Sequence, residues 1–239
     1  MIMSKSRYLL AGLALLGASV ANAGITLGGT RIIYPEKSKE VSILVKNDGA
    51  RDIMIQSWLD PEQGKQGKDV PFAITPSLSR LAGNKQQMLR IFYFGQGLPA
   101  DKESVFWLSV QEIPQKAEGD NTLQIALRQR IKVFYRPGNL PGSPEDAANG
   151  LKWQVLNEKG KHYLHVINNA PYFVSLSDVK LVVGAEKHVI ASDMVSPFGH
   201  KKFEIKDSLD AWSRAAMTVE FMNINDYGAP VSHSQSVGE

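Results

Sequence analysis

Apolar and polar residues alternate along much of this chain with the two-residue period of β-strands. Turn-forming clusters such as Asn47-Asp48-Gly49 separate the alternating runs, and no segment sustains a helical period. Strands are expected at 40–46, 52–59, 85–94, 104–113, 122–135, 151–156, 162–168, 172–183, 201–205 and 217–223, with a last run near Val231. Short strands at this spacing predict an all-β protein of the sandwich type.

The pattern breaks once, after Pro137. Residues 137–144 read PGNLPGSP, which is rich in residues that interrupt helices and strands, and 145–150 follow before the alternation resumes. This composition is typical of an inter-domain linker. We therefore expect two β-sandwich domains of similar size, at 24–137 and 151–239, joined by a linker at 138–150.

One expected strand is unusually long. The segment 122–135 begins with Leu123, Ile125 and Leu127 in alternation and then carries three cations, where about five or six residues is usual for a strand. The cations are Arg128, Arg130 and Lys132. Two interpretations remain open on periodicity alone: the apolar residues face this protein's own core, or the strand pairs with another chain.

Residues 1–23 are predicted to be a secretory signal peptide. Lys5 and Arg7 precede a short apolar stretch, and Ala21-Asn22-Ala23 is a small-x-small cleavage site. The apolar stretch is too short to span a bilayer, and no later segment approaches the roughly 20 apolar residues that a span requires. The mature chain is expected to begin at Gly24, outside the cytoplasm.

Charge and composition exclude several classes of partner and site. The chain has 27 Lys and Arg against 24 Asp and Glu; losing Lys5 and Arg7 leaves 25 against 24, a net charge of about +1. This balance gives no electrostatic reason for nucleic-acid or membrane binding. With no cysteine, stability must come from core burial rather than disulfides. His162 and His165 lie at odd spacing in a strand, so no shared metal is expected, and no cofactor motif occurs.

Several segments, in this order along the chain, resemble the periplasmic chaperones that assemble fimbriae with an outer-membrane usher. They are 98–107 (LPADKESVFW), 111–114 (QEIP), 123–127 (LQIAL), 131–137 (IKVFYRP), 224–228 (INDYG) and, more weakly, 169–172 (NAPY). Ser109 stands where the family usually has Asn, and Gln115 where it usually has Pro or a small residue. The resemblance favours the intermolecular interpretation of the long strand.

The resemblance implies a non-enzymatic protein of two immunoglobulin-like sandwiches set at an angle, with a cleft between them. Such chaperones bind, fold and cap fimbrial subunits that lack their last strand, and deliver them to the usher. Lending a strand to the open groove is a known mode of strand addition. Since unpaired apolar edges aggregate, weak self-association of the free protein through the same edge is also expected.

The resemblance also assigns roles to individual residues. Leu123, Ile125 and Leu127 match the donated side chains, and Arg31 with Lys132 matches the cations that anchor the subunit's C-terminal carboxylate. Strict alternation places Lys132 on the face opposite the three donated residues, so a bulge, a strong twist or a long reach around the edge is needed. Ionic contacts across the domain junction are implied for Glu103, Arg136 and Asp226.

Two other functions compete with this interpretation. A secreted adhesin or carbohydrate-binding module would present Trp58, Trp107 or Trp153 as stacking platforms, although core packing is the commoner role of tryptophan. A periplasmic hydrolase is less favoured, because no nucleophile and base occur in a recognisable arrangement. The short connection 115–121 resembles the family branch that builds rod-like or thin adhesive fimbriae.

Overall fold

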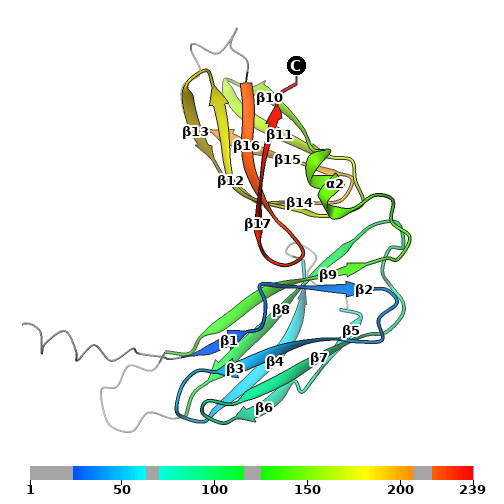
Figure 1. Ribbon diagram of the computed structural model, residues 1–239, viewed down its shortest axis with the longest axis vertical. Helices are drawn as coiled ribbons and strands as arrows, with labels where there is room; N and C mark the ends of the chain where they lie inside the picture. Colours follow the sequence, from blue (N-terminus) through cyan, green and yellow to red (C-terminus); the bar gives the residue numbers. More distant parts are fainter. Residues whose placement is uncertain (1–23, 63–69, 116–124, 207–216, 239) are drawn as a thin grey trace, which may run out of the picture.

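The computed structural model describes residues 24–62, 70–115, 125–206 and 217–238. The predicted signal peptide, Leu123 and most of the connection 115–121 lie outside these residues. Two β-sandwiches are stacked at an angle, with the turn between the last two strands of the second reaching toward the first (Figure 1). The predicted fold class, two immunoglobulin-like sandwiches, is confirmed. No helix in the described part of the chain is long and apolar enough to cross a bilayer.

The first sandwich consists of two sheets. One has the order β1 (Ile25–Leu27), β3 (Val41–Asn47), β7 (Gln86–Tyr93) and β5 (Phe72–Thr75). The other has the order β2 (Arg31–Pro35), β9 (Arg128–Arg136), β8 (Ser104–Ile113), β4 (Ile53–Pro61) and β6 (Leu78–Leu81). All pairs are antiparallel except β2 and β9, which run parallel.

The second sandwich packs a sheet of β10 (Lys152–Glu158), β11 (Lys161–Asn168) and β15 (Gly199–Ile205) against a larger one. The larger sheet has the order β13 (Glu186–Ile190), β12 (Val174–Val183), β16 (Met217–Ile224) and β17 (Pro230–Ser236), and β14 (Met194–Val195) pairs with β12.

Alternation explains both cores. In β9, Ile131, Val133 and Tyr135 are buried among the apolar residues of the first sandwich. In the second, Trp153 packs with Phe221 at a ring-centroid distance of 5.3 Å. A small third cluster, which includes Phe134 and Met194, joins the two sandwiches. The main apolar cluster of each sandwich is thus buried inside it, and a separate apolar cluster lies at the junction between them.

The predicted linker is only partly irregular. It contains a short helix, α2 (Pro144–Asn149), whose Ala147 and Ala148 are buried in the second core. Ser143 caps the helix by accepting a hydrogen bond from the Asp146 amide at 3.1 Å, and Pro144 occupies the first turn, where its missing N–H costs nothing. This helix was not predicted from the sequence, because six residues are too few to show a helical period.

Candidate binding site between the two sandwiches

The long strand begins later than its sequence pattern indicates. Strand β9 spans Arg128–Arg136, not 122–135, and Ile125 and Leu127 precede it without regular strand pairing. One ladder-like bond continues outward, from the Glu112 amide to the Leu127 carbonyl at 2.9 Å. A strand persists only where a neighbour supplies main-chain partners, and β8 ends at Ile113.

The two predicted donor residues that the structure describes are exposed. Ile125 is 65% exposed and Leu127 is 44% exposed, and neither belongs to the core of the first sandwich. Leu127 lies against the N-terminal segment, since a Cβ placed on Gly24 would be 3.0 Å from its side chain. Two large aliphatic side chains side by side in solvent are unusual in a monomeric protein.

One edge of β9 is open before Lys132. Strand β8 occupies the other edge from Arg128 to Tyr135, whereas β2 begins to pair only at the row of Arg31 and Lys132. Among the described strands, none pairs with residues 128–131 on the β2 side. An added strand therefore finds unpaired main-chain groups that end where β2 takes over.

Arg31 and Lys132 stand side by side at this point, as register partners in the parallel pair β2–β9. Arg31 donates through Nη1 to the carbonyl of Ile224 in the second sandwich at 2.7 Å. Its Nε is buried and has no hydrogen-bond partner within the described residues. Lys132 contacts Ser175 Oγ weakly, at 3.5 Å. The two cations lack a carboxylate at ion-pair distance in the described part of the chain.

The surroundings of Arg31 and Lys132 destabilise the charged form of both side chains. Burial lowers the pKa of Arg31, although the nearby carboxylates of Asp226 and Glu103 oppose the shift. Burial also lowers the pKa of Lys132, and the positive charge of Arg31 lowers it further. Two half-buried like charges in adjacent strands repel each other. An anion placed between them would relieve both the repulsion and the lost hydration.

The orientation of Lys132 needs no bulge. The register between β8 and β9 runs without a shift from Arg128 to Tyr135. Ile131 and Val133 face the first core, so Lys132 faces away from it, toward Ser175 of the second sandwich. Lys132 therefore lies on the side of the sheet that faces the second sandwich, and a bulge within β9 is excluded as the explanation.

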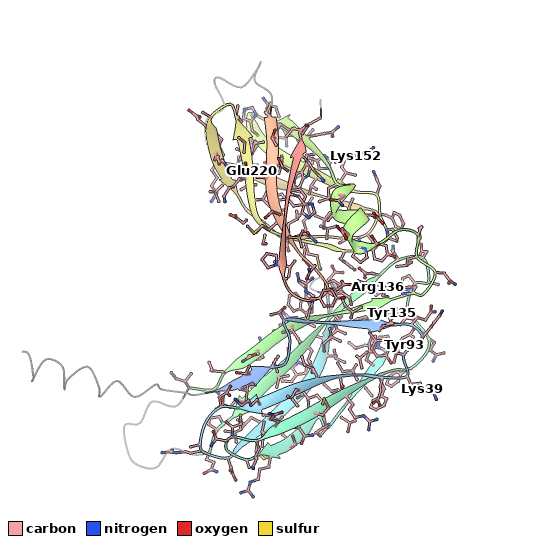
Figure 2. The ribbon with its side chains drawn as sticks, in the orientation of Figure 1. Lys39, Tyr93, Tyr135, Arg136, Lys152 and Glu220 are labelled. Atoms are coloured by element: carbon pink, nitrogen blue, oxygen red, sulfur yellow. The ribbon has the colours of Figure 1, made fainter. Side chains whose placement is uncertain are left out.

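The structure brings the three predicted junction residues together. Arg136 donates through Nε to Glu103 at 2.6 Å and grips both oxygens of Asp226 at 2.6 and 2.9 Å. The second oxygen of Glu103 accepts from the Phe173 amide at 2.8 Å. Figure 2 shows Arg136 between the two sandwiches. The Glu103 side chain is only 2% exposed, so this is a desolvated network rather than a surface pair.

The burial of this network shifts the pKa values of Glu103 and Arg136. Desolvation raises the pKa of Glu103, an effect that Arg136 and the Phe173 amide only partly offset. The two carboxylates raise the pKa of Arg136 against the effect of its own burial. The arginine therefore stays charged, and it is the group that makes a buried Glu103 carboxylate tolerable.

The turn between β16 and β17 completes the junction from the second sandwich. Gly228 has φ +82°, and a Cβ added there would lie 2.2 Å from Thr30 Oγ1 of the first sandwich. Asn225 holds the turn by accepting, through its side chain, from the amides of Tyr227 and Ala229 at 3.0 and 2.9 Å. Only glycine fits this contact without displacing Thr30.

We expect Gly228→Ala to destabilise the protein by about 1–3 kcal/mol, since it adds both a strained φ and a collision with Thr30. Chemical denaturation of the whole protein measures this. Adding Thr30→Ala should recover the part due to the collision and leave the part due to φ. Equal stability of Gly228→Ala and the unmodified protein would show that the turn is not seated against Thr30.

Apart from Asp226, the groups that the second sandwich contributes at the junction were not predicted from the sequence. They are the Ile224 carbonyl, the Phe173 amide and Ser175. Two are main-chain groups, which leave no composition signal, although segment 224–228 had already been singled out. The resemblance assigned no role to Tyr227, which belongs to that segment.

The three tryptophans that were considered as platforms, Trp58, Trp107 and Trp153, do not form open stacking surfaces. Trp153 is 1% exposed in the second core. Trp107 lies under Arg130 and Lys132, with 4.6 and 5.6 Å from each cationic group to the ring centroid, and Trp58 lies under Arg128 at 6.0 Å. These cation–ring contacts stabilise the outer face of the sheet formed by β4, β8 and β9. A stacking surface for sugars is not favoured by this arrangement.

No metal centre is evident in the described part of the chain. His165 meets His200 rather than His162, with ring centroids 5.1 Å apart, and no group of three or more His, Cys, Asp or Glu side chains gathers there.

Comparisons with known proteins agree with this geometry. Residues 24–141 match the family model described as pili and flagellar-assembly chaperone, PapD N-terminal domain, and residues 146–235 match pili assembly chaperone PapD, C-terminal domain. This chain belongs to the pilus-assembly chaperone family. That family is one of chaperones and not of enzymes, as the sequence resemblance implied.

Individual relatives cover most of the chain. The probable fimbrial chaperone YadV of Escherichia coli K12 is 36% identical over 223 residues, 90% of each chain. The chaperone protein FimC of Escherichia coli K12 is 35% identical over 230 residues, 92% of this chain and 89% of its own. The crystal structure of the YadV chaperone has a TM-score of 0.78 at 34% identity, covering 89% of this chain and 99% of its own.

Some of the similar structures are complexes of a chaperone with a subunit. One of them is the SafA pilin of Salmonella enterica in complex with the SafB chaperone, matched with a TM-score of 0.73 at 26% identity over 92% of this chain and 99% of that one.

Proposed function

We propose that this chaperone caps fimbrial subunits by pairing the open edge of β9, and the segment before it, with the subunit, and that Arg31 and Lys132 bind the subunit's C-terminal carboxylate. The observation that carries the proposal is the place where the open edge ends. An added strand can extend along 128–131 only as far as Arg31, where β2 takes the edge. Arg31 and Lys132, which have no carboxylate at ion-pair distance in the described residues, lie at the point where the open edge ends.

The positions of the proposed carboxylate anchor and donor residues along the chain imply a direction for the added strand. If the carboxylate lies at Lys132 and the apolar residues Ile125 and Leu127 come earlier in the chain, the added strand runs parallel to β9. Main-chain bonds then give affinity, alternate side chains fill the subunit's groove, and the carboxylate sets the register. Burying Leu123, Ile125 and Leu127 contributes on the order of 5 kcal/mol before ordering costs.

The same proposal covers location and partners. The predicted signal peptide and the family support a location in the periplasm, where the chaperone would deliver the capped subunit to an outer-membrane usher. We infer a subunit of rod-like or thin adhesive fimbriae from the short connection 115–121. Weak self-association through the donor edge is expected for the free protein, because Ile125 and Leu127 are exposed there.

The donor role is tested by Ile125→Asp. Because Ile125 is 65% exposed, this change should leave stability within about 0.5 kcal/mol of the unmodified protein. It should also abolish subunit capture, since a charge would have to enter an apolar groove without a partner. A denaturant melt beside co-purification with the co-expressed fimbrial subunit measures both, and sedimentation measures self-association.

Ile131→Asp is the matched control, six residues further along on the same alternation. Ile131 is buried in the first core, so its replacement should destabilise the protein by several kcal/mol. A melt of Ile125→Asp as poor as that of Ile131→Asp would place Ile125 in the protein's own core and end the donor assignment.

A further inference from the structure

A cavity of about 310 Å³ lies at the domain junction, directly beyond Arg31. Its apolar lining comes from both sandwiches and includes Phe134, Phe173, Ile224 and Val231. The volume is in the range of small-ligand pockets, and an apolar wall with a few polar groups is their usual composition. None of the roles described above uses this space.

The charges around the cavity leave one cation available. Arg136 is engaged by Glu103 and Asp226, and Glu145 lies exposed at the rim on α2. Arg31 keeps a buried Nε with no partner in the described residues. An anionic group that binds Arg31 from the open edge of β9 would therefore lie beside this cavity, because Arg31 is one of its lining residues.

Tyr227 stands at the same mouth. It is 95% exposed, and no other large apolar side chain in the described residues is more exposed. Its turn is nevertheless rigid: the Asn225 side chain accepts two amide bonds, and Gly228 is packed on Thr30. An aromatic side chain presented to solvent from an immobilised turn is typical of an interface anchor, because little entropy is lost when it is covered.

From the cavity, the free Arg31 Nε and Tyr227, we propose that the cavity receives the side chain of the subunit's C-terminal residue and that Tyr227 closes over it. This inference rests on the proposed carboxylate anchor. With the carboxylate between Arg31 and Lys132, the side chain of the terminal residue would lie next to Arg31, which lines the cavity. The chemistry of the walls selects an aromatic or large aliphatic side chain.

Three short peptides test the proposal: acetyl-Ala-Thr-Phe, acetyl-Ala-Thr-Gly and the C-terminal amide of the first. Amide chemical shifts of the ¹⁵N-labelled full-length mature protein give an affinity for each. The Phe acid should bind at least tenfold more tightly than the Gly acid, with the largest shifts near Ile224 and Val231. Tyr227→Ala should abolish that preference, and Tyr227→Phe should keep it.

Phe198→Ala is the matched control, because Phe198 is another exposed aromatic residue of the second sandwich, at 56% exposure, and does not line the cavity. It should leave the preference for Phe unchanged. Equal binding of the Phe and Gly acids, or a preference that survives Tyr227→Ala, would overturn the proposal. Equal binding of acid and amide with the Phe preference intact would support the cavity and refute the carboxylate anchor instead.

Discussion

Arg136→Ala should cost this protein about 3–5 kcal/mol of stability, because it leaves the Glu103 carboxylate buried without its cation. Glu103 is 3% exposed, and the remaining donor to its side chain is the Phe173 amide. The change also releases Asp226, so the contact between the sandwiches weakens at the same time. Denaturant unfolding followed by tryptophan fluorescence measures the loss.

The sign of the pH dependence gives a second readout. The pKa of Glu103 is raised in the folded protein, so its contribution to stability is fully present below the ordinary glutamate pKa and is lost as pH rises through the raised value. Without Arg136 this pKa rises further. The penalty of Arg136→Ala should therefore shrink as the pH is lowered from 7 toward 5.

Two comparisons separate this network from ordinary surface charge. Lys161→Ala removes an exposed pair with Glu204, at 60% and 44% side-chain exposure, and should leave the free energy of unfolding nearly unchanged. Adding Glu103→Gln to Arg136→Ala should restore part of the stability, because the uncompensated charge is gone. If Arg136→Ala melts like Lys161→Ala, the junction is held by its apolar contacts alone.

The two predicted strands with the best-placed bounds are apolar for different reasons. Segment 217–223 became β16 and buries every second residue from Val219, whereas 104–113 became β8 and is an apolar run with buried residues on both faces. Strands β1, β5 and β14 escaped notice because two to four residues cannot display a period. For β9 the pattern began before the strand does, since Ile125 and Leu127 have no paired strand within the described residues.

Helix α2 was predictable from chemistry rather than from periodicity. Ser143-Pro144-Glu145-Asp146 offers a cap, a proline in the first turn and two acids near the helix N-terminus. The breakers around it masked this signal, because Pro and Gly in 137–142 argue for an irregular segment. The helix then depends on tertiary burial of Ala147 and Ala148, which no local pattern reveals.

In the candidate site, too, some groups could be predicted from the sequence and others could not. Charged side chains such as Arg31 and Arg136 could be named from the resemblance, because their types and positions are visible in sequence. The carboxylates of Glu103 and Asp226 could be named in the same way. The main-chain partners from the second sandwich could not, because the Ile224 carbonyl that accepts from Arg31 and the Phe173 amide that donates to Glu103 are groups that nearly every residue carries. The cavity beside Arg31 depends on how the two halves meet, which local sequence does not encode.

Arg31→Ala combined with Lys132→Ala should abolish stable complexes with the fimbrial subunit. Each change removes a charged partner of a desolvated carboxylate, and such truncations cost about 2–5 kcal/mol, or on the order of 30- to 3,000-fold in affinity. Folding should survive. Lys132→Ala removes a cation whose pKa is lowered by burial and by Arg31, so its loss relieves repulsion within the free protein.

Arg128→Ala is the control for the anchor, because Arg128 lies four residues before Lys132 on the same face of β9 and is stacked on Trp58. It should lower affinity less than tenfold. The anchor also predicts weaker binding as pH rises past the lowered pKa of Lys132, since the complex holds the lysine proton more tightly than the free protein does. Co-purification of a normal amount of subunit with the Arg31→Ala, Lys132→Ala protein would rule out these residues as the anchor. The open edge of β9 would then have to set the register of the added strand without a fixed chain end.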